Sequence, residues 1–202
     1  MSVGEALEFE TVILGGGVVL FPSDTVYGLA CSPQDADAIE RLYALKGRAP
    51  EKAAAVMFFS LEAALAALGE LGERTTAAVR ALMPGAVTVL LQNPARRYPL
   101  TCAADPQTLG VRVVDVPVLR GVGIPVLQSS ANHSGEADAR TLAAVAPAIR
   151  AGAGLVIDGG ELPGVPSTVV DLRRYEHDAE WSIVRRGLVD SAAVAGRLDG
   201  NE

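Results

Sequence analysis

Three hydroxyl side chains follow the first apolar stretch of the chain. Ser23, Thr25 and Tyr27 alternate with Asp24 and Val26. Because alternate side chains share a face in an extended chain, this spacing predicts a row of hydroxyls that binds a small polar ligand. The same residues also fit a turn at a strand end, in which Ser and Asp side chains bond to their own backbone. The sequence leaves both interpretations open.

Basic residues lie close together at Lys46, Arg48 and Lys52, in a chain that is acidic as a whole. An arginine can bind two oxygens of a phosphate or carboxylate at once, so the three side chains predict an anion site. The alternative is structural. Gly47 is a typical residue at the end of a helix, and basic residues there interact favourably with the negative end of the helix dipole.

A polar loop follows the apolar strand expected over 124–128. Loops at strand ends are common places for ligand contacts in α/β sheets. Within this loop Ser130 and Asn132 occupy alternate positions, so they can share one face. Loops of Ser, Asn and Gly are also ordinary turns. We expect His133 to be an exposed loop residue rather than a general base.

A second set of polar residues belongs to the expected strands. Arg112 stands between two valines, where an arginine is costly unless it meets an acid or an anionic ligand. Asp115 and Asp171 are candidate structural partners, and that role competes with ligand binding. Farther along the chain, Ser167 begins one expected strand and Arg185 ends the next.

Short β-rich stretches alternate with Ala-rich helical patterns, which predicts an α/β fold. Both short turns and helices separate the strands, so a mixed sheet is favoured over a purely parallel one. Gly15-Gly16-Gly17 is expected to form a turn. The expected strands are Thr11–Phe21, Ala54–Phe59, Ala86–Gln92, Thr108–Val114, Ile124–Gln128, Leu155–Asp158, Ser167–Leu172 and Trp181–Arg185. The expected helices are Asp35–Lys46, Ser60–Gly69, Glu73–Met83 and Thr141–Ala151.

A length of 202 residues suits one domain. We expect that domain to span residues 1–202, with its core at about 12–189. A short C-terminal tail would follow, and a terminal helix with a frayed end fits the stretch Asp190–Glu202.

Composition narrows the classes of function. Half of the residues (50%) are hydrophobic, which predicts a folded core rather than disorder. A net charge of −7 argues against a basic nucleic-acid-binding surface, although one basic cleft is compatible with it. The chain has two cysteines and two histidines, so no metal site built from Cys or His is expected.

The chain carries no recognisable targeting or nucleotide-binding signature. Its N-terminus lacks the pattern of a secretory signal, and no apolar run reaches the roughly 18 residues of a membrane span. We therefore expect a cytoplasmic protein without a membrane partner. The Gly-rich phosphate loop and the Gly-x-Ser-x-Gly elbow are also missing from the sequence.

Eight short segments resemble, in the same order, the signatures of the threonylcarbamoyl-adenylate synthase family, whose domain is called YrdC-like. The resemblance runs from about Val12 to Val189. Its most telling motifs are the Lys-x-Arg at Lys46 and the Ser-x-Asn at Ser130. The segments are Pro22-Ser-Asp-Thr-Val-Tyr-Gly-Leu, Lys46-Gly-Arg, Pro84-Gly-Ala-Val-Thr, Gly110-Val-Arg-Val, Ser130-Ala-Asn-His-Ser-Gly, Asp158-Gly-Gly, Ser167-Thr-Val-Val-Asp and Val184-Arg-Arg-Gly.

The resemblance implies a twisted mixed β-sheet with flanking helices around a concave, positively charged cavity. It also implies an enzyme, a nucleotidyltransferase, that condenses L-threonine, bicarbonate and ATP into threonylcarbamoyl-adenylate and pyrophosphate. Mg²⁺ would accompany the ATP. The product would serve the modification of adenosine 37 in tRNAs that read codons beginning with A. The expected partners are therefore the three substrates, the tRNA-modifying transferase that uses the product, and tRNA or double-stranded RNA.

The resemblance further implies roles for individual residues. The catalytic residues would be Lys46, Arg48, Ser130 and Asn132. The threonine-binding residues would be Ser23, Thr25, Tyr27, Arg112 and Ser167. The ATP-binding residues would be Lys46, Arg48, Lys52, Thr101, Ser130, Asn132 and Arg185. No residue is expected to bind a metal ion, because Mg²⁺ retains water and would be held chiefly by the phosphates.

The chain departs from the usual family pattern in the loops at 49–55 and 165–166. Ala49 stands where the family usually has Pro, and Pro166 stands where it usually has Glu. Two other functions therefore stay open. One is a degenerate relative that binds nucleotide or double-stranded RNA without turnover. The other is an enzyme for a different carbamoyl substrate, as in hydrogenase-maturation proteins, although those normally carry Cys clusters.

Overall fold

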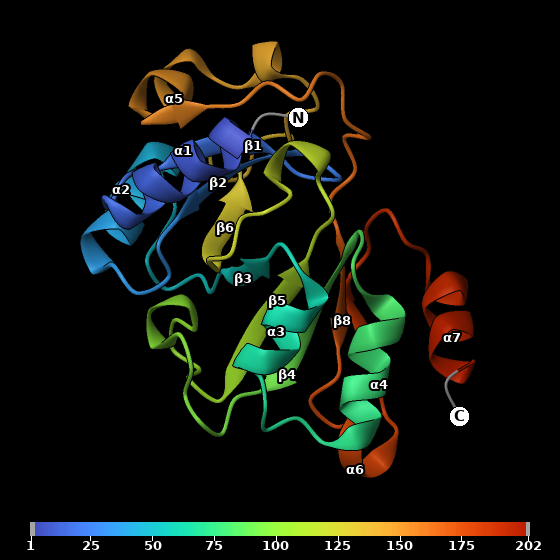
Figure 1. Ribbon diagram of the computed structural model, residues 1–202. Helices are drawn as coiled ribbons and strands as arrows, with labels where there is room; N and C mark the ends of the chain where they lie inside the picture. The colour runs from blue at the N-terminus through green and yellow to red at the C-terminus, as the bar shows by residue number, and fades with distance from the viewer. Residues whose placement is uncertain (1–2, 201–202) are drawn as a thin grey trace.

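The computed structural model describes residues 3–200, in which nine strands form one sheet with helices packed along it (Figure 1). The strands lie in the order β7-β1-β2-β6-β3-β5-β4-β8-β9. Three neighbouring pairs are parallel and five are antiparallel, so the mixed sheet expected from the sequence is confirmed. The strands are β1 (Val19–Pro22), β2 (Tyr27–Cys31), β3 (Ala55–Phe58), β4 (Val87–Gln92), β5 (Thr108–Val113), β6 (Val126–Ser130), β7 (Leu155–Val156), β8 (Thr168–Asp171) and β9 (Ser182–Arg185).

The helices flank both parts of the sheet. In Figure 1, α1, α2 and α5 lie beside β1, β2 and β6, whereas α3, α4, α6 and α7 lie beside the part that contains β3, β4, β5 and β8. The α-helices are α1 (Val3–Leu14), α2 (Ala36–Lys46), α3 (Leu61–Ala67), α4 (Glu73–Leu82), α5 (Pro147–Gly152), α6 (Tyr175–Asp178) and α7 (Ser191–Asp199). The short 3₁₀ helices are η1 (Pro99–Thr101), η2 (Pro117–Leu119) and η3 (Leu142–Ala144).

Three apolar clusters hold the helices to the sheet. One joins β3, β4, β5 and β8 to α4 and α7, and it includes Val194 and Leu198. A second joins β1 and β2 to α2 and α5, with Leu42 fully buried in it. The third packs α1 against β1, where the Phe9 ring meets Phe21 edge to face at 5.8 Å. Because α1 and α7 both contribute to these clusters, the core extends beyond the expected range of 12–189.

Helix α2 begins and ends where its sequence predicts. The Asp35 side chain accepts a hydrogen bond from the backbone N–H of Ala38, which satisfies one of the free donors of the first turn. At the other end Gly47 adopts a left-handed conformation, with φ of 57°. Glycine adopts this conformation without the steric cost that a side chain brings. The turn therefore fixes where Lys46 and Arg48 leave the helix.

The expected strand over 11–21 is wrong in its first part. Residues up to Leu14 belong to α1, Gly15 and Gly16 form the expected turn, and β1 starts only at Val19. The chain then reverses over 23–26 into β2, which pairs with both β1 and β6. No separate strand was expected there, because the polar turn residues were compatible with a continuous extended segment.

The expected helix over 141–151 is divided into η3 and α5. Pro147 stands at the first turn of α5, and a proline there lacks the N–H that a continuous helix would need. The expected terminal helix is present as α7, and the end of the tail lies outside the described residues. None of the helices described over residues 3–200 has the length and apolar character needed to cross a membrane.

Candidate active site

Segments from six strands meet around one cavity of about 430 Å³. Six of the residues singled out from the sequence lie in its wall, although they come from positions far apart in the chain. They are Arg48, Thr101, Arg112, Ser130, Ser167 and Arg185. The wall is therefore rich in cationic and hydroxyl groups, as the family resemblance implied.

Arg112 is buried in β5, with only 2% of its surface exposed. Its guanidinium forms an ion pair with Asp24 and donates a hydrogen bond to the Thr25 hydroxyl at 2.9 Å. Burial lowers the pKa of Arg112 and raises the pKa of Asp24. An arginine stays charged despite such a shift, because its ordinary pKa is far above neutrality. The site thus contains a fixed positive charge on an otherwise apolar strand.

The partners suggested for Arg112 from the sequence are wrong. Asp115 forms an ion pair with Arg120 at 2.7 Å, and Asp171 pairs with Arg173. Arg112 is instead paired with Asp24. Asp24 lies 88 positions away in the sequence, and the turn between β1 and β2 brings it next to Arg112. A residue so distant in sequence is not identifiable from the neighbourhood of Arg112.

The hydroxyl segment forms a turn rather than an extended row. The Ser23 hydroxyl oxygen accepts from the backbone N–H groups of Thr25 and Val26, each at 3.2 Å, and its O–H donates to the carbonyl of Val26 at 2.7 Å. The turn interpretation is thus confirmed and the extended interpretation is wrong. Because of the turn, Thr25 contacts Arg112, whereas Tyr27 does not line the cavity.

Tyr27 instead anchors the loop that follows β7. Its hydroxyl donates to Asp158 Oδ1 at 2.7 Å and accepts from the backbone N–H of Gly159 at 2.9 Å. The same loop is joined to the turn by a hydrogen bond from the N–H of Gly164 to the carbonyl of Thr25, at 2.9 Å. The contacts of Tyr27 are thus those of a residue that positions the turn.

Lys46 connects α2 to the loop after β6. Only 2% of the residue is exposed, and its Nζ donates to the backbone carbonyls of Ser130 and Asn132, the latter at 2.7 Å, and to Asn132 Oδ1 at 3.0 Å. Burial lowers the pKa of Lys46 to about 8, and the nearby Arg48 guanidinium acts in the same direction. The Lys-x-Arg and Ser-x-Asn motifs are therefore in direct contact.

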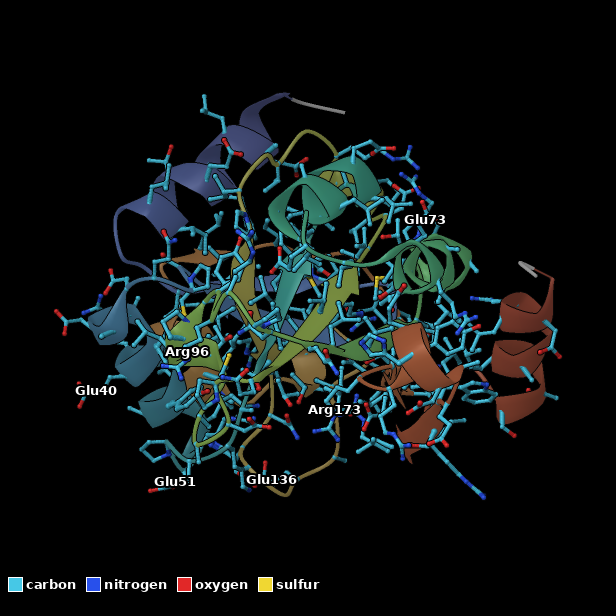
Figure 2. The ribbon with its side chains drawn as sticks, turned by 90° about the horizontal axis from the view of Figure 1, so that it is seen from below. Glu40, Glu51, Glu73, Arg96, Glu136 and Arg173 are labelled. Carbon is cyan, nitrogen blue, oxygen red and sulfur yellow. The ribbon has the colours of Figure 1, made fainter. Side chains whose placement is uncertain are left out.

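Arg48 lies in the cavity wall and Lys52 lies outside it. Arg48 donates to the carbonyl of Ala53 at 2.6 Å, and Lys52 donates to the Ser134 hydroxyl at 3.3 Å. The second contact joins the loop after α2 to the loop after β6. Figure 2 shows Glu51 and Glu136, one from each of these loops, at the same edge of the molecule.

The opposite wall is built from β8 and β9. The Ser167 hydroxyl lies 2.9 Å from the Thr88 hydroxyl, and Arg185 donates to the Ser167 carbonyl at 2.8 Å. Thr101 enters from η1, where its hydroxyl donates to the Tyr98 carbonyl at 2.9 Å. The contacts with Ser167 hold Arg185, which is a third arginine of the cavity wall besides Arg48 and Arg112.

Within residues 3–200, two arginines of the cavity wall each have a buried nitrogen atom without a hydrogen-bond partner. Among the described residues, the buried side-chain nitrogen and oxygen atoms without a hydrogen-bond partner are Nε of Arg48 and Nε of Arg112. Both belong to arginines of the cavity wall. Unpaired buried donors on charged groups are costly, and the guanidinium groups of both arginines are incompletely paired within the part of the protein that the structure describes.

Sequence reasoning did not single out several lining residues. Thr88 and Gln128 lie inside or beside the family motifs, and that position was the signal that pointed to them. Asp105, Asp138 and Cys102 carried no such signal. In residues 3–200, no group of three or more His, Cys, Asp or Glu side chains is placed to hold a metal ion.

Comparisons with known proteins agree with the geometry. The family model Sua5_yciO_yrdC, described as telomere recombination, matches residues 11–187. A protein from Xanthomonas campestris pv. campestris named threonylcarbamoyl-AMP synthase is 36% identical over 169 residues, which are 78% of this chain and 88% of the relative. A protein of the same name from Chromohalobacter salexigens is 34% identical over 167 residues, or 80% of this chain and 89% of the relative.

Solved structures share the fold. Sua5 from P. abyssi, in its complex with L-threonine, aligns with a TM-score of 0.82 and 25% identity over 96% of this chain. The alignment covers 57% of the Sua5 chain, so the present chain spans little more than half of that protein. YciO from E. coli aligns with a TM-score of 0.76 and 24% identity, over 93% of this chain and 91% of its own.

Proposed function

The chain belongs to the Sua5/YciO/YrdC family, and we propose that it is a threonylcarbamoyl-AMP synthase. In this proposal it joins L-threonine, bicarbonate and ATP into threonylcarbamoyl-adenylate and pyrophosphate. The observation that supports it most directly is that three arginines, Arg48, Arg112 and Arg185, line one cavity, and that two of them, Arg48 and Arg112, have a buried Nε without a hydrogen-bond partner among the described residues. Two anionic substrate groups, a carboxylate and a phosphate, would form charge-assisted hydrogen bonds with these arginines.

We assign threonine to the part of the cavity around Arg112. Its carboxylate would pair with the guanidinium, and the hydroxyls of Thr25 and Ser167 lie close to that group and to Arg185. Ser23 shapes the turn that presents Thr25, so its role is to hold the turn in place. The relative solved with L-threonine is consistent with an amino-acid substrate.

We assign ATP to the part of the cavity around Arg48 and Ser130. Lys46 would act from behind this wall, because its ammonium fixes the backbone of Ser130 and Asn132. Arg185 faces the same cavity and would neutralise phosphate charge from the other side. Mg²⁺ would bind chiefly to the phosphates, and it supplies charge neutralisation there when bound.

The reaction in this proposal needs no protein nucleophile. The threonine ammonium group first loses a proton to solvent. The free amine then attacks the carbon of bicarbonate, a C–N bond forms, and water leaves to give the carbamate. A carbamate oxygen then attacks the α-phosphorus of ATP, and the bond from this phosphorus to the pyrophosphate oxygen breaks. The cavity would promote both steps by holding the reactants together and by stabilising negative charge with fixed donors.

The chemical lability of the product indicates which kind of protein should use it next. An acyl phosphate anhydride of this kind hydrolyses readily in water, so we propose direct use by a cytoplasmic transferase that modifies tRNA. The chain's own net charge of −7 makes broad contact with RNA unfavourable, and any RNA contact would depend on a local basic groove.

The experiment is an assay of pyrophosphate release by the purified protein with ATP, Mg²⁺ and bicarbonate. Adding L-threonine should produce pyrophosphate together with a threonylcarbamoyl-adenylate that mass spectrometry detects, whereas D-threonine should not. No threonine-dependent release would contradict the proposal. ATP binding without release would favour the degenerate relative instead.

A further inference from the structure

The loop over 94–106, between β4 and β5, brings residues into the cavity wall. Thr101, Cys102 and Asp105 of this loop line the cavity. Apart from the short helix η1, the loop consists of turns and irregular backbone. Because such a segment has no ladder of backbone hydrogen bonds, other contacts must determine where its residues lie.

The loop has a backbone conformation that its residues ordinarily avoid. Arg96, Tyr98 and Ala103 have positive φ angles, of 49°, 48° and 50°. This left-handed conformation is unfavourable for residues other than glycine, because it brings the Cβ atom close to the following carbonyl oxygen. Three such residues in one loop persist only where their surroundings fix them.

The carboxamide of Asn93 supplies contacts that fix the loop. Asn93 directly follows β4, and only 1% of the residue is exposed. Its Oδ1 accepts from the backbone N–H of Arg97 at 2.9 Å, and its Nδ2 donates to the backbone carbonyls of Arg97 at 3.0 Å and Pro106 at 3.1 Å. Arg97 stands between the left-handed residues Arg96 and Tyr98. One side chain therefore holds this part of the loop from both sides and also joins the start of the loop to its end.

From Tyr98 the contacts continue to the cavity. The carbonyl of Tyr98 accepts from both the N–H and the hydroxyl of Thr101, each at 2.9 Å. The carbonyl of Thr101 accepts from the N–H of Ala54 at 2.9 Å. The carbonyl of the preceding residue, Ala53, accepts from the Arg48 guanidinium at 2.6 Å. The loop thus reaches Arg48, around which we place ATP, through a continuous series of contacts.

We propose that Asn93 is a positioning residue for the part of the cavity that binds ATP. Asn93 is not one of the lining residues and acts through the loop. Its amide holds the loop in the conformation that places Thr101 in the wall, and Thr101 in turn holds the segment that contacts Arg48. The inference rests on the function proposed above, and it adds a residue outside the family motifs. The part of the cavity around Arg112 should not depend on Asn93, since the turn over 23–26 has contacts of its own.

The test compares the wild type with Asn93→Ala and Asn93→Asp. The aspartate variant keeps the shape of the side chain and an acceptor for the N–H of Arg97, but a carboxylate cannot donate to the two carbonyls. Leu198→Ala is the control for a general loss of stability, because its helix, α7, contributes no residue to the cavity wall. Calorimetric titration measures ATP binding, and the pyrophosphate assay measures KM for ATP and for threonine. Amide hydrogen exchange measures how firmly Ala54 and Thr101 are held.

Asn93→Ala should weaken ATP binding and raise the KM for ATP on the order of 10-fold, while the KM for threonine changes by less than about twofold. Asn93→Asp should show the same selective loss. In both variants, exchange at the N–H groups of Ala54 and Thr101 should accelerate relative to the amides of β1. Leu198→Ala should leave both KM values, the ATP affinity and this relative exchange as they are in the wild type.

Three results would overturn the inference. They are unchanged ATP affinity in a folded Asn93 variant, equal increases in both KM values, and unchanged relative exchange at Ala54. The exchange measurement needs no substrate, so it tests the contacts of Asn93 apart from the proposed function. A wild type that releases no pyrophosphate contradicts only the proposed function. An Asn93 variant that forms product with the KM values of the wild type refutes only the role of Asn93.

Discussion

The ammonium group of Lys46 joins two segments that are far apart in the sequence. It donates to the carbonyls of Ser130 and Asn132 from the last turn of α2, in a place where 2% of the residue is exposed. Buried carbonyls that lose a charged donor pay the full cost of desolvation. At the scale of single residues, this contact therefore determines both local stability and the geometry of the Ser-x-Asn loop.

Replacing Lys46 by alanine should reduce the rate of pyrophosphate release on the order of 100-fold, because the loop that holds Ser130 would no longer be fixed. The free energy of unfolding should fall by about 1–3 kcal/mol. Steady-state assays and urea unfolding measure the two quantities. Arg80→Ala, which removes an exposed cation of α4, should change neither. Activity lost only in proportion to folded protein would mean that Lys46 merely ends the helix.

The pKa of Lys46 predicts a pH dependence with opposite signs for activity and stability. Its pKa in the folded protein is about 8, against an ordinary value of 10.5. Between these two pH values the folded protein binds fewer protons than the unfolded chain, so Lys46 makes the free energy of unfolding rise with pH. Activity needs the charged form and should fall about tenfold per pH unit well above 8.

A pH profile of kcat/KM for the wild type and for Lys46→Arg checks this assignment. The guanidinium stays charged over the whole range, so the variant should lose the decline on the basic side even if its overall rate is lower. The same decline in both proteins would assign the titration to another group.

The site residues differ in how well the sequence predicts them. The motif residues Arg48 and Ser130 line the cavity, whereas Lys46 and Asn132 of the same two motifs are not among its lining residues. Tyr27 and Lys52 do not line it. Tyr27 follows the turn at 23–26 and Lys52 lies in the loop after α2, and the alternation of side chains along an extended chain predicts the course of neither segment. The pairing of Arg112 with Asp24 depends on long-range folding, so no local pattern contains it.

At the scale of elements, the end of α2 positions the Lys-x-Arg motif. Gly47 has a φ of 57°, and no atom lies within 4 Å of the position that a Cβ would take. Gly47→Ala should therefore cost about 1 kcal/mol through backbone conformation alone, and Gly47→Asn less, since asparagine tolerates this region better. Urea unfolding of both variants measures the difference. An equal cost for the two would contradict the conformational explanation.

The elements also show where pattern reasoning succeeds. The expected helix Asp35–Lys46 matches α2 closely, because Asp35 and Gly47 are residue types that typically begin and end a helix. The expected strand over 11–21 has apolar residues on both sides of its three glycines, and periodicity alone does not divide it into α1 and β1. The glycines at 15–17 mark the division, and here they take precedence over the apolar run.

At the scale of the whole molecule, the first and last helices complete the core. Leu198 of α7 is 1% exposed and belongs to the same cluster as Val79 and Leu82 of α4. Leu198→Ala should lower the free energy of unfolding by about 2–5 kcal/mol, through lost burial and the cavity left behind. Thermal and urea unfolding measure this effect.

The activity of the folded fraction should be unchanged in Leu198→Ala, because α7 contributes no residue to the cavity wall. A variant that unfolds normally yet has a different KM for threonine would show that α7 influences the site. The family resemblance implied a mixed sheet around a concave cavity, but the order of strands, which brings β6 and β9 to one cavity, is contained in no local pattern.

If one cavity binds threonine beside ATP, a crystal structure of the protein soaked with both ligands should show the two together. We predict both ligands in the cavity of about 430 Å³, with the threonine carboxylate on Arg112 and the phosphates next to Arg48 and Ser130. Ligands found instead in the neighbouring cleft beside Trp181, on the other side of Asp105 and Thr108, or nowhere on the protein, would show that this cavity is not the binding site.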